Sequence, residues 1–182
     1  MRHAGLQLRG MGMLDGMRAV VLLAATVATG LMAGVFGIYA VAIMPGLRTT
    51  DDRTFLGSFQ AIDRAIVNPL FLLTFMGALV LAVVAALLQL GPGRGPVLIW
   101  TAAAAVLYLV AVVVTVAVHL PLNDALKAAG PPAEMADPAA VRAAFDEARW
   151  VAWNIVRVLT SGVAFGCLAW ALVQWGRVQA AG

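Results

Sequence analysis

The sequence predicts an all-α integral membrane protein, built as a four-helix bundle whose helices cross the bilayer. Three observations lead to this prediction. Of the 182 residues, 63% are hydrophobic and only 12% are charged, whereas about 25% of the residues of a soluble domain are charged. Four apolar runs each reach the roughly 20 residues that a spanning helix needs. A Gly/Pro turn at residues 91–96 folds the second and third runs into a tight hairpin.

The first span is predicted at about residues 19–44, after a short basic tail at residues 1–18. Gly30 and Gly34 form a GxxxG pattern, which indicates close packing against another helix. Pro45, followed by Gly46, is expected to end this span, because proline cannot continue a helical hydrogen-bond ladder.

A helix is expected to begin around Asp51 and Asp52, because acidic residues favour the first turn. It leads into the second span, at about residues 65–90, where Pro69 is expected to disturb the helix. The third span covers about residues 97–120 and is expected to end at Pro121.

The longest connection, residues 121–149, contains four prolines and a short amphipathic helix at residues 139–149. The fourth span follows at about residues 151–175, and residues 177–182 form a C-terminal tail. The whole transmembrane domain is therefore expected at residues 19–176.

The chain contains signs of two related helical hairpins in parallel orientation. Each half has a proline after an apolar run and, further on, a Phe and an Asn at the same spacing: Pro45, Phe59 and Asn68 in the first half, and Pro121, Phe145 and Asn154 in the second. Such a duplication would gather the polar ends of all four helices at one membrane face.

The distribution of charged residues gives a weaker signal for the orientation of the protein in the membrane than the apolar runs give for the spans. The side that holds both termini and the 91–96 turn has five Lys or Arg residues, against six on the other side. The positive-inside rule therefore gives near-parity. We expect both termini to be cytoplasmic in the cell membrane, because their segments are shorter and contain one acid, Asp15.

A polar and aromatic stripe opens the fourth span. Trp150, Trp153, Asn154 and Arg157 follow one another at helical spacing. A guanidinium about one turn inside an apolar helix costs about 2.5–3.5 kcal/mol on insertion scales, which favours a functional role for Arg157. Polar residues of the other spans are expected at the same face: Asp63, Arg64, Asn68, His119, Asn123 and Asp124.

These residue types suggest a cavity with acid–base chemistry. His119 can titrate near neutral pH, and Arg157, Asn154 and Asn123 can donate to a developing oxyanion. Arg157 needs an acceptor, for which Asp63 or Asp124 is expected. Interfacial anchoring or helix capping explains Trp150, Arg64 and Asp124 equally well.

Composition excludes several other functions. The basic residues are dispersed, which excludes a nucleic-acid partner. One cysteine, Cys167, excludes a thiol–disulfide oxidoreductase. The two histidines, His3 and His119, cannot both lie in the membrane around a haem, and no spacing matches a metal site.

The four spans, the run His119-Leu120-Pro121-Leu122-Asn123 and the pattern Trp150-x2-Trp153-Asn154-x2-Arg157 resemble the anthrone oxygenase-like membrane proteins, a family long catalogued as a domain of unknown function. The resemblance extends from about Val20 to Trp175. It implies oxidation of an anthrone to an anthraquinone by dioxygen, with no metal, flavin or other cofactor. The ligand would then be an apolar aromatic molecule, a polyaromatic or phenolic ketone.

The resemblance also implies roles for individual residues. His119 would be the base that removes the acidic benzylic proton, oriented by Asp124. Arg157, Asn154 and Asn123 would bind the enolate oxygen, while Trp153 would lie against the rings. Trp150, Asp63, Arg64 and Asn68 would complete the substrate site.

Other classes remain open at this point. One is a non-catalytic four-helix subunit or scaffold, which would bind a membrane partner or form a homo-oligomer in contact with membrane lipid. Another is a trimeric enzyme like the membrane glutathione transferases, although Asp63, Arg64 and Asn68 match those motifs only loosely. A small multidrug transporter is disfavoured, because no span has an acidic residue at its centre.

Overall fold

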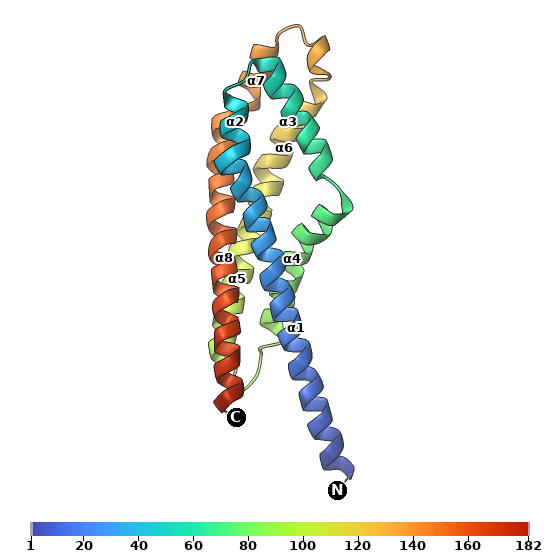
Figure 1. Cartoon of the computed structure of the whole chain (residues 1–182), viewed down its shortest axis with the longest axis vertical. Coiled ribbons are helices and arrows are strands. Elements are labelled where there is room, and N and C mark those ends of the chain that lie inside the picture. Colours follow the sequence, from blue (N-terminus) through green and yellow to red (C-terminus); the bar gives the residue numbers. More distant parts are fainter. Residues whose placement is uncertain (1, 182) are drawn as a thin grey trace.

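The computed structural model describes the backbone of residues 2–181 and the side chains of residues 12–180. Within this range the chain is almost entirely helical and contains no strand. Four long helices run side by side (Figure 1): α1 (Arg2–Ile38), α4 (Pro69–Leu87), α5 (Gly95–Val114) and α8 (Glu147–Ala181). The all-α four-helix prediction is confirmed.

The four long helices form a ring in which each contacts two neighbours. Helix α1 packs against α4 and α8, and α5 packs against the same two helices. Fully buried alanines, such as Ala78, Ala104 and Ala164, line the interior and allow close approach of the backbones. A Cβ at Gly30 would lie 2.9 Å from the Phe165 ring of α8, whereas a Cβ at Gly34 would meet nothing within 4 Å, so only the first glycine of the predicted GxxxG pattern is closely packed.

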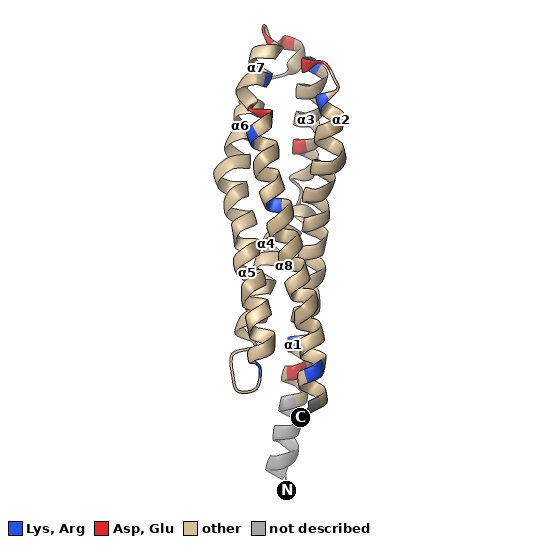
Figure 2. Ribbon diagram, turned by 90° about the vertical axis from the view of Figure 1, so that its left-hand side faces the viewer, with Lys and Arg blue, Asp and Glu red and all other residues tan. Residues whose placement is uncertain are grey.

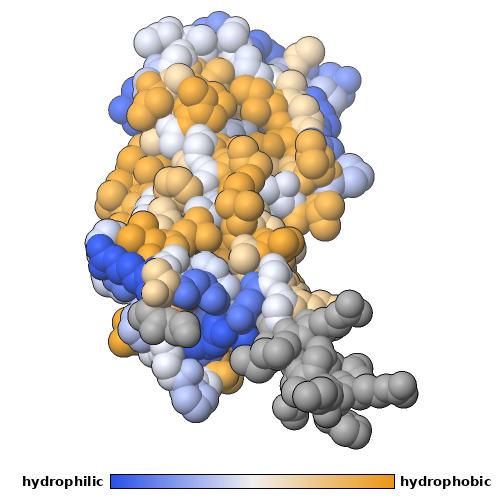
Figure 3. Space-filling model, turned by 60° about the horizontal axis from the view of Figure 1, so that its bottom comes forward, coloured by the Kyte–Doolittle hydropathy of each residue, from blue (hydrophilic) through white to orange (hydrophobic). Residues whose placement is uncertain are grey.

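The outer surface of the bundle is apolar. Four helical segments are long and apolar enough to cross a membrane: Gly12–Arg48, Pro69–Leu87, Gly95–Ala128 and Pro138–Ala180. Figure 2 shows that charged residues gather toward the two ends of the molecule, and Figure 3 shows hydrophobic sides above a hydrophilic lower end. The chain is therefore a multi-pass membrane protein whose bundle contacts lipid.

Both chain ends lie at the same end of the bundle, together with the α4–α5 turn (Figure 1). Gly91 and Gly93 adopt positive φ angles of 144° and 76°, which only glycine tolerates readily. Asp15 accepts from Arg18 at 2.9 Å and from Arg94 at 2.6 Å, and this ties α1 to the turn. The side chains of Arg2 and Arg9, assigned to the basic tail, lie outside the described residues.

Helix α3 (Asp52–Ile66) precedes α4 and is separated from it by a break. The Asp51 side chain caps α3 by accepting from the Thr54 amide, as expected. Hydrogen bonds from the Thr54 hydroxyl and amide hold the pKa of the Asp51 carboxyl below its usual value. Asn68 caps α4 by accepting from the Phe71 amide, and Pro69 occupies the first turn of α4.

Two prolines are accommodated by π-helical turns. The turn η1 (Tyr39–Ile43) precedes Pro45 in α2 (Met44–Arg48), and η2 (Thr115–His119) precedes Pro121 in α6 (Leu120–Ala128). Proline lacks an N–H and its ring crowds the carbonyl four residues earlier; an extra residue in the preceding turn relieves that conflict. Both helices therefore continue past the prolines that were predicted to end them.

The paired π turns support the predicted duplication, because each ends two residues before its proline. The proposed match of Asn68 with Asn154 is weaker. Asn68 is an exposed helix cap between α3 and α4, whereas Asn154 is fully buried inside α8.

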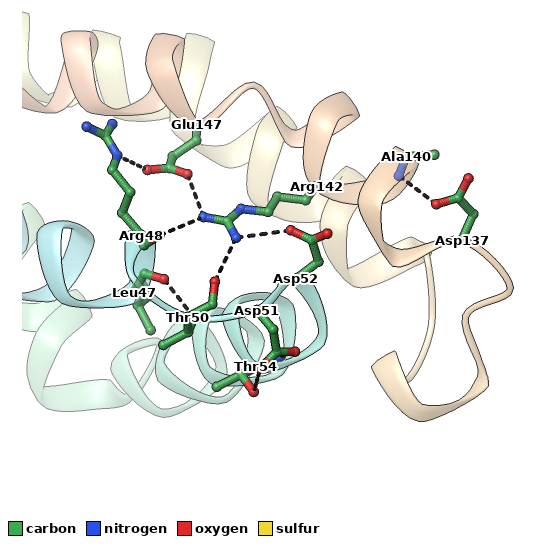
Figure 4. A network of polar contacts seen from close by, with 10 residues as sticks. All are labelled: Leu47, Arg48, Thr50, Asp51, Asp52, Thr54, Asp137, Ala140, Arg142 and Glu147. Atoms are coloured by element: carbon green, nitrogen blue, oxygen red, sulfur yellow. Dashed lines mark hydrogen bonds and ion pairs between the residues drawn. The ribbon is translucent and has the colours of Figure 1, made fainter.

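A cap of short helices covers the end of the bundle opposite the termini (Figure 1). It contains α2, α3, α6, a 3₁₀ turn η3 (Pro132–Glu134) and α7 (Pro138–Phe145). Figure 4 shows Arg142 of α7 donating to the Thr50 carbonyl, Asp52 and Glu147, while Arg48 also donates to Glu147. These contacts hold α7 and the start of α8 on the α2–α3 connection.

Candidate functional site

A small cavity of about 80 Å³ lies between the bundle and the cap. The apolar part of its wall includes Val35, Phe36, Ile66, Phe71 and Trp150. Its polar wall gathers side chains from η1, α3, η2, α6 and α8: Tyr39, Asp63, Thr115, His119, Asn123 and Arg157. Five of the ten residues singled out from the sequence therefore line one cavity: Asp63, His119, Asn123, Trp150 and Arg157.

His119 lines this cavity, and one of its ring nitrogens is unpaired among the described residues. The side chain is 1% exposed, and its Nδ1 lies 3.3 Å from the Val114 carbonyl oxygen. A carbonyl only accepts, so Nδ1 carries the proton and Nε2 keeps a lone pair in the neutral ring. Nε2 is buried and has no hydrogen-bond partner among the described residues. Nε2 therefore remains an unused hydrogen-bond acceptor.

The π turn η2 determines how His119 is held. His119 is its last residue, and the Leu120 amide donates to the Thr115 carbonyl five residues earlier. π turns of this kind are frequent at functional sites. The His119 ring also meets the Trp150 ring edge-on, at a centroid distance of 4.9 Å and an angle of 81°. Backbone and aromatic contacts together fix the orientation of the imidazole.

Arg157 is buried in α8, with 6% of its surface exposed. Its Nη2 donates to Asn154 Oδ1 at 2.7 Å, and its Nη1 donates to Thr115 Oγ1 at 3.3 Å. The guanidinium also lies over the Phe36 ring, 4.5 Å from its centroid. Within the described part of the chain, Nε has no partner and no carboxylate pairs with this arginine. The prediction that Asp63 or Asp124 accepts from Arg157 is wrong.

Asn154 supports Arg157 from outside the cavity. It is fully buried, donates to the Phe36 carbonyl at 3.1 Å and accepts from Arg157. Its carbonyl oxygen is occupied by the guanidinium, and the residue is absent from the cavity wall. The structure therefore does not place Asn154 at the cavity, where the sequence predicted that it would bind the enolate oxygen.

A second polar chain leads from the cavity to the surface. Trp150 Nε1 donates to Asn123 Oδ1 at 3.0 Å, and Asn123 Nδ2 donates to Asp63 Oδ1 at 2.7 Å. The other carboxylate oxygen of Asp63 lies 2.9 Å from Lys127 Nζ, which also pairs with the exposed Asp124. Asp63 is 7% exposed, so the ion pair neutralises a nearly buried charge.

The remaining sequence candidates lie away from the cavity. Trp153 is 40% exposed on the outside of α8. Arg64 and Asn68 are exposed, and Asn68 caps α4. The Asp124 side chain is 66% exposed and bonds Lys127, so it does not orient His119. These four residues fit the anchor and cap explanation better than a direct contact with ligand.

Two polar residues of the cavity were not singled out from the sequence. Tyr39 is the first residue of η1, and Thr115 is the first residue of η2. Each lies six positions before the proline of its half of the chain. The alignment of Pro45 with Pro121 therefore pairs Tyr39 with Thr115 and could have identified both. Among the described residues, no three His, Cys, Asp or Glu side chains gather closely enough to hold a metal ion.

Comparison with known proteins gives one match. A family model described as anthrone oxygenase matches residues 66–167. This range includes the π turn η2 and the polar part of α8, so it contains His119, Asn123, Trp150, Asn154 and Arg157. No curated protein and no solved structure matches the chain. Because the match covers more than half of the 182 residues, the chain belongs to the anthrone oxygenase family.

Proposed function

We propose that the protein is a cofactor-independent membrane oxygenase that converts a phenolic anthrone-type ketone to the corresponding quinone in the cavity between bundle and cap. One observation supports this most strongly. His119 and Arg157 line the same cavity, and among the described residues His119 Nε2 has no hydrogen-bond partner and the Arg157 guanidinium has no carboxylate partner. A base beside an uncompensated positive charge suits a reaction that passes through an enolate.

In the first step, His119 Nε2 removes a proton from the methylene carbon opposite the ketone. The electron pair of that C–H bond moves into the ring system and places negative charge on the ketone oxygen. Arg157 stabilises this charge, because a preorganised cation in a site shielded from water acts strongly on a developing anion. Family membership supports the choice of substrate class.

In the second step, the electron-rich carbon is oxidised by dioxygen. One electron passes to dioxygen, and the two radicals combine to form a C–O bond. The resulting peroxide takes a proton from the His119 imidazolium. Loss of the second C–H proton with cleavage of the O–O bond then gives the new carbonyl and one molecule of water. One oxygen atom enters the quinone, and the ketone substrate itself supplies all four electrons.

Other residues hold this arrangement in place. Asn154 fixes Arg157 through the 2.7 Å hydrogen bond. Asn123 connects Trp150 to Asp63, so it keeps the aromatic wall and the buried carboxylate in register. Tyr39 adds a hydroxyl to the wall beside them. We assign these residues positioning and binding roles, and assign proton transfer to His119.

The substrate class matches a membrane location, because polycyclic ketones partition into lipid. We propose the cell membrane, with both termini in the cytoplasm. Both ends of the chain lie at the end of the bundle opposite the cap (Figure 1). Eight of the nine acidic residues belong to the cap side, and Asp15 alone belongs to the other side.

Oxygen uptake tests the proposal. Wild type, His119→Ala, Arg157→Leu and the exposed-site control Trp153→Ala would be reconstituted in nanodiscs and given a dihydroxyanthrone. We expect the rate of oxygen uptake by His119→Ala to be lower than that of the wild type by about 100-fold or more, which is the usual contribution of a general base. Trp153→Ala should retain wild-type turnover.

Full turnover by folded His119→Ala and folded Arg157→Leu would refute the roles proposed for His119 and Arg157. Absence of turnover in the wild type, with no ligand retained, would favour a non-catalytic subunit instead.

A further inference from the structure

A second hollow opens on the side of the bundle, between α1 and the start of α4. It is a groove of about 300 Å³, and its wall includes Leu31, Met32, Val35, Ile66, Leu70 and Phe71. Leu31 is 59% exposed and Leu70 is 74% exposed, so the rim lies on the lipid-facing surface. The groove therefore faces the bilayer.

The groove and the inner cavity are adjacent. Val35, Ile66 and Phe71 line both, so a single layer of side chains separates them. The break between α3 and α4 lies at this level, and Figure 1 shows the chain leaving the bundle there before α4 returns. A continuous helix would close this wall, whereas the break leaves it one side chain thick.

Polar groups at the groove are already satisfied. Asn68 accepts from the Phe71 amide and donates to the Ala65 carbonyl, while the Thr74 hydroxyl donates to the Leu70 carbonyl. The groove thus offers a ligand only apolar contact. The polar groups that would fix a ligand lie on the other side of Phe71, in the inner cavity.

The size of the inner cavity limits what it can contain. An apolar cavity of roughly 150 Å³ binds one benzene molecule, whereas this cavity measures about 80 Å³. It can receive the oxygenated edge of a ligand, but a fused three-ring system must extend beyond it. The adjacent groove reaches the lower end of the roughly 300–1,000 Å³ that is usual for ligand pockets.

We propose that the cavity and the groove are two parts of one substrate site, entered sideways from the bilayer. The ketone of the substrate reaches Arg157 and its methylene carbon reaches His119, while its outer apolar rings extend into the groove between α1 and α4. The shared residues Val35, Ile66 and Phe71 form the passage. This inference rests on the proposed function. It adds the route by which the substrate enters and the residues that select substrates by their number of fused rings.

Phe71 is the residue best placed to regulate the passage. Its ring stacks on Phe75 at a centroid distance of 5.8 Å and an interplanar angle of 4°. A rotation of this partly buried ring would join the two hollows. A flat aromatic ligand can replace the lost stacking contact, so the passage favours planar rings over acyl chains.

Two leucines of α4 give a matched test. Leu70 lines the groove and Leu73 does not, yet they are 74% and 73% exposed. Leu70→Trp fills the groove, and Leu73→Trp adds the same side chain to the open lipid surface. The probes are a one-ring hydroxyacetophenone and a three-ring dihydroxyanthraquinone, whose binding to nanodiscs is measured after subtraction of empty nanodiscs.

We expect wild type and Leu73→Trp to bind the three-ring probe about tenfold tighter than the one-ring probe, because more apolar surface is buried. Leu70→Trp should bind the three-ring probe no tighter than the one-ring probe, because it fills the groove that would hold the additional rings. Equal three-ring affinity in Leu70→Trp and wild type would overturn the groove proposal and leave the proposed function standing.

Two further outcomes would also contradict the proposal. If Leu70→Trp lost co-purified phospholipid but kept three-ring binding, the groove would be a lipid site. If the wild type bound neither probe, the proposed function would fail together with the groove.

Discussion

Replacing Arg157 with leucine separates a functional charge from a structural one. In the wild type, the guanidinium donates to Asn154 and Thr115 and lies over the Phe36 ring. Arg157→Leu removes these contacts and also removes a charge whose insertion costs about 2.5–3.5 kcal/mol.

The two effects nearly cancel in the free energy of unfolding. Thr115 keeps its hydrogen bond to the Ala111 carbonyl, so the substitution leaves Asn154 Oδ1 as the main unpaired atom. That atom costs about 1–3 kcal/mol. We therefore expect the free energy of unfolding of Arg157→Leu to lie within about 2 kcal/mol of the wild-type value.

Ligand binding should respond much more strongly. Loss of one hydrogen bond from a charged donor costs about 1.5–3 kcal/mol, which corresponds to about 10- to 150-fold in affinity. Binding of a dihydroxyanthraquinone, measured by dialysis in nanodiscs, gives the affinity. Unfolding followed by circular dichroism in detergent gives the stability.

Asn154→Leu is the matched control. It leaves both Arg157 Nη2 and the Phe36 carbonyl without their partners in a fully buried place. We expect it to destabilise by about 2–4 kcal/mol, more than Arg157→Leu. A strongly destabilised Arg157→Leu protein with wild-type affinity would refute the reasoning and make Arg157 a structural residue.

Three further predictions concern packing, the cap and cofactors. Gly30→Val should destabilise by about 1–3 kcal/mol through the clash with Phe165, whereas Gly34→Val, which meets nothing within 4 Å, should not; equal effects in thermal unfolding would contradict the packing of α1 on α8. Arg142→Ala should speed amide hydrogen exchange in α7 about tenfold, and unchanged exchange would show that its ion pairs do not hold the cap. Treatment with a metal chelator should leave oxygen uptake unchanged, and a loss restored by added metal would refute cofactor independence.

Local signals in the sequence predicted the elements correctly. The glycines of the 91–96 turn, the Asp51 cap and the Asn68–Pro69 break each depend on neighbouring residues, and each occurs in the structure. The prolines were harder to interpret. Pro121 removes one hydrogen bond, but a π turn accommodates it, and packing against the cap lets the helix continue to Ala128.

Which residues of α8 face the cavity depends on how this helix is rotated about its own axis. At about 100° per residue, Asn154 lies about 40° from Trp150, Arg157 about 20° to the other side, and Trp153 about 60° away. The sequence predicted this stripe, but packing determines its centre. Trp150 is 2% exposed and faces the cavity, whereas Trp153 is 40% exposed at the edge of the stripe.

Contacts between distant elements lay beyond sequence reasoning. The pairing of Asp63 with Lys127 joins α3 to α6, 64 positions apart. An acceptor for Arg157 was expected among the acids, but neutral partners, Asn154 and Thr115, take that place. Asn154 lies three residues before Arg157 on α8, so this contact is local, whereas Thr115 reaches Arg157 from the π turn η2 of another helix.

The fate of labelled dioxygen tests the central claim most directly. Wild-type protein in nanodiscs would be given a dihydroxyanthrone under ¹⁸O₂, with His119→Ala measuring the uncatalysed reaction. The mechanism predicts a quinone carrying one ¹⁸O atom, formed far faster by the wild type, with one dioxygen consumed per substrate. A product rate equal to that of His119→Ala, or a quinone whose new oxygen comes from water, would contradict oxygenase chemistry at this cavity.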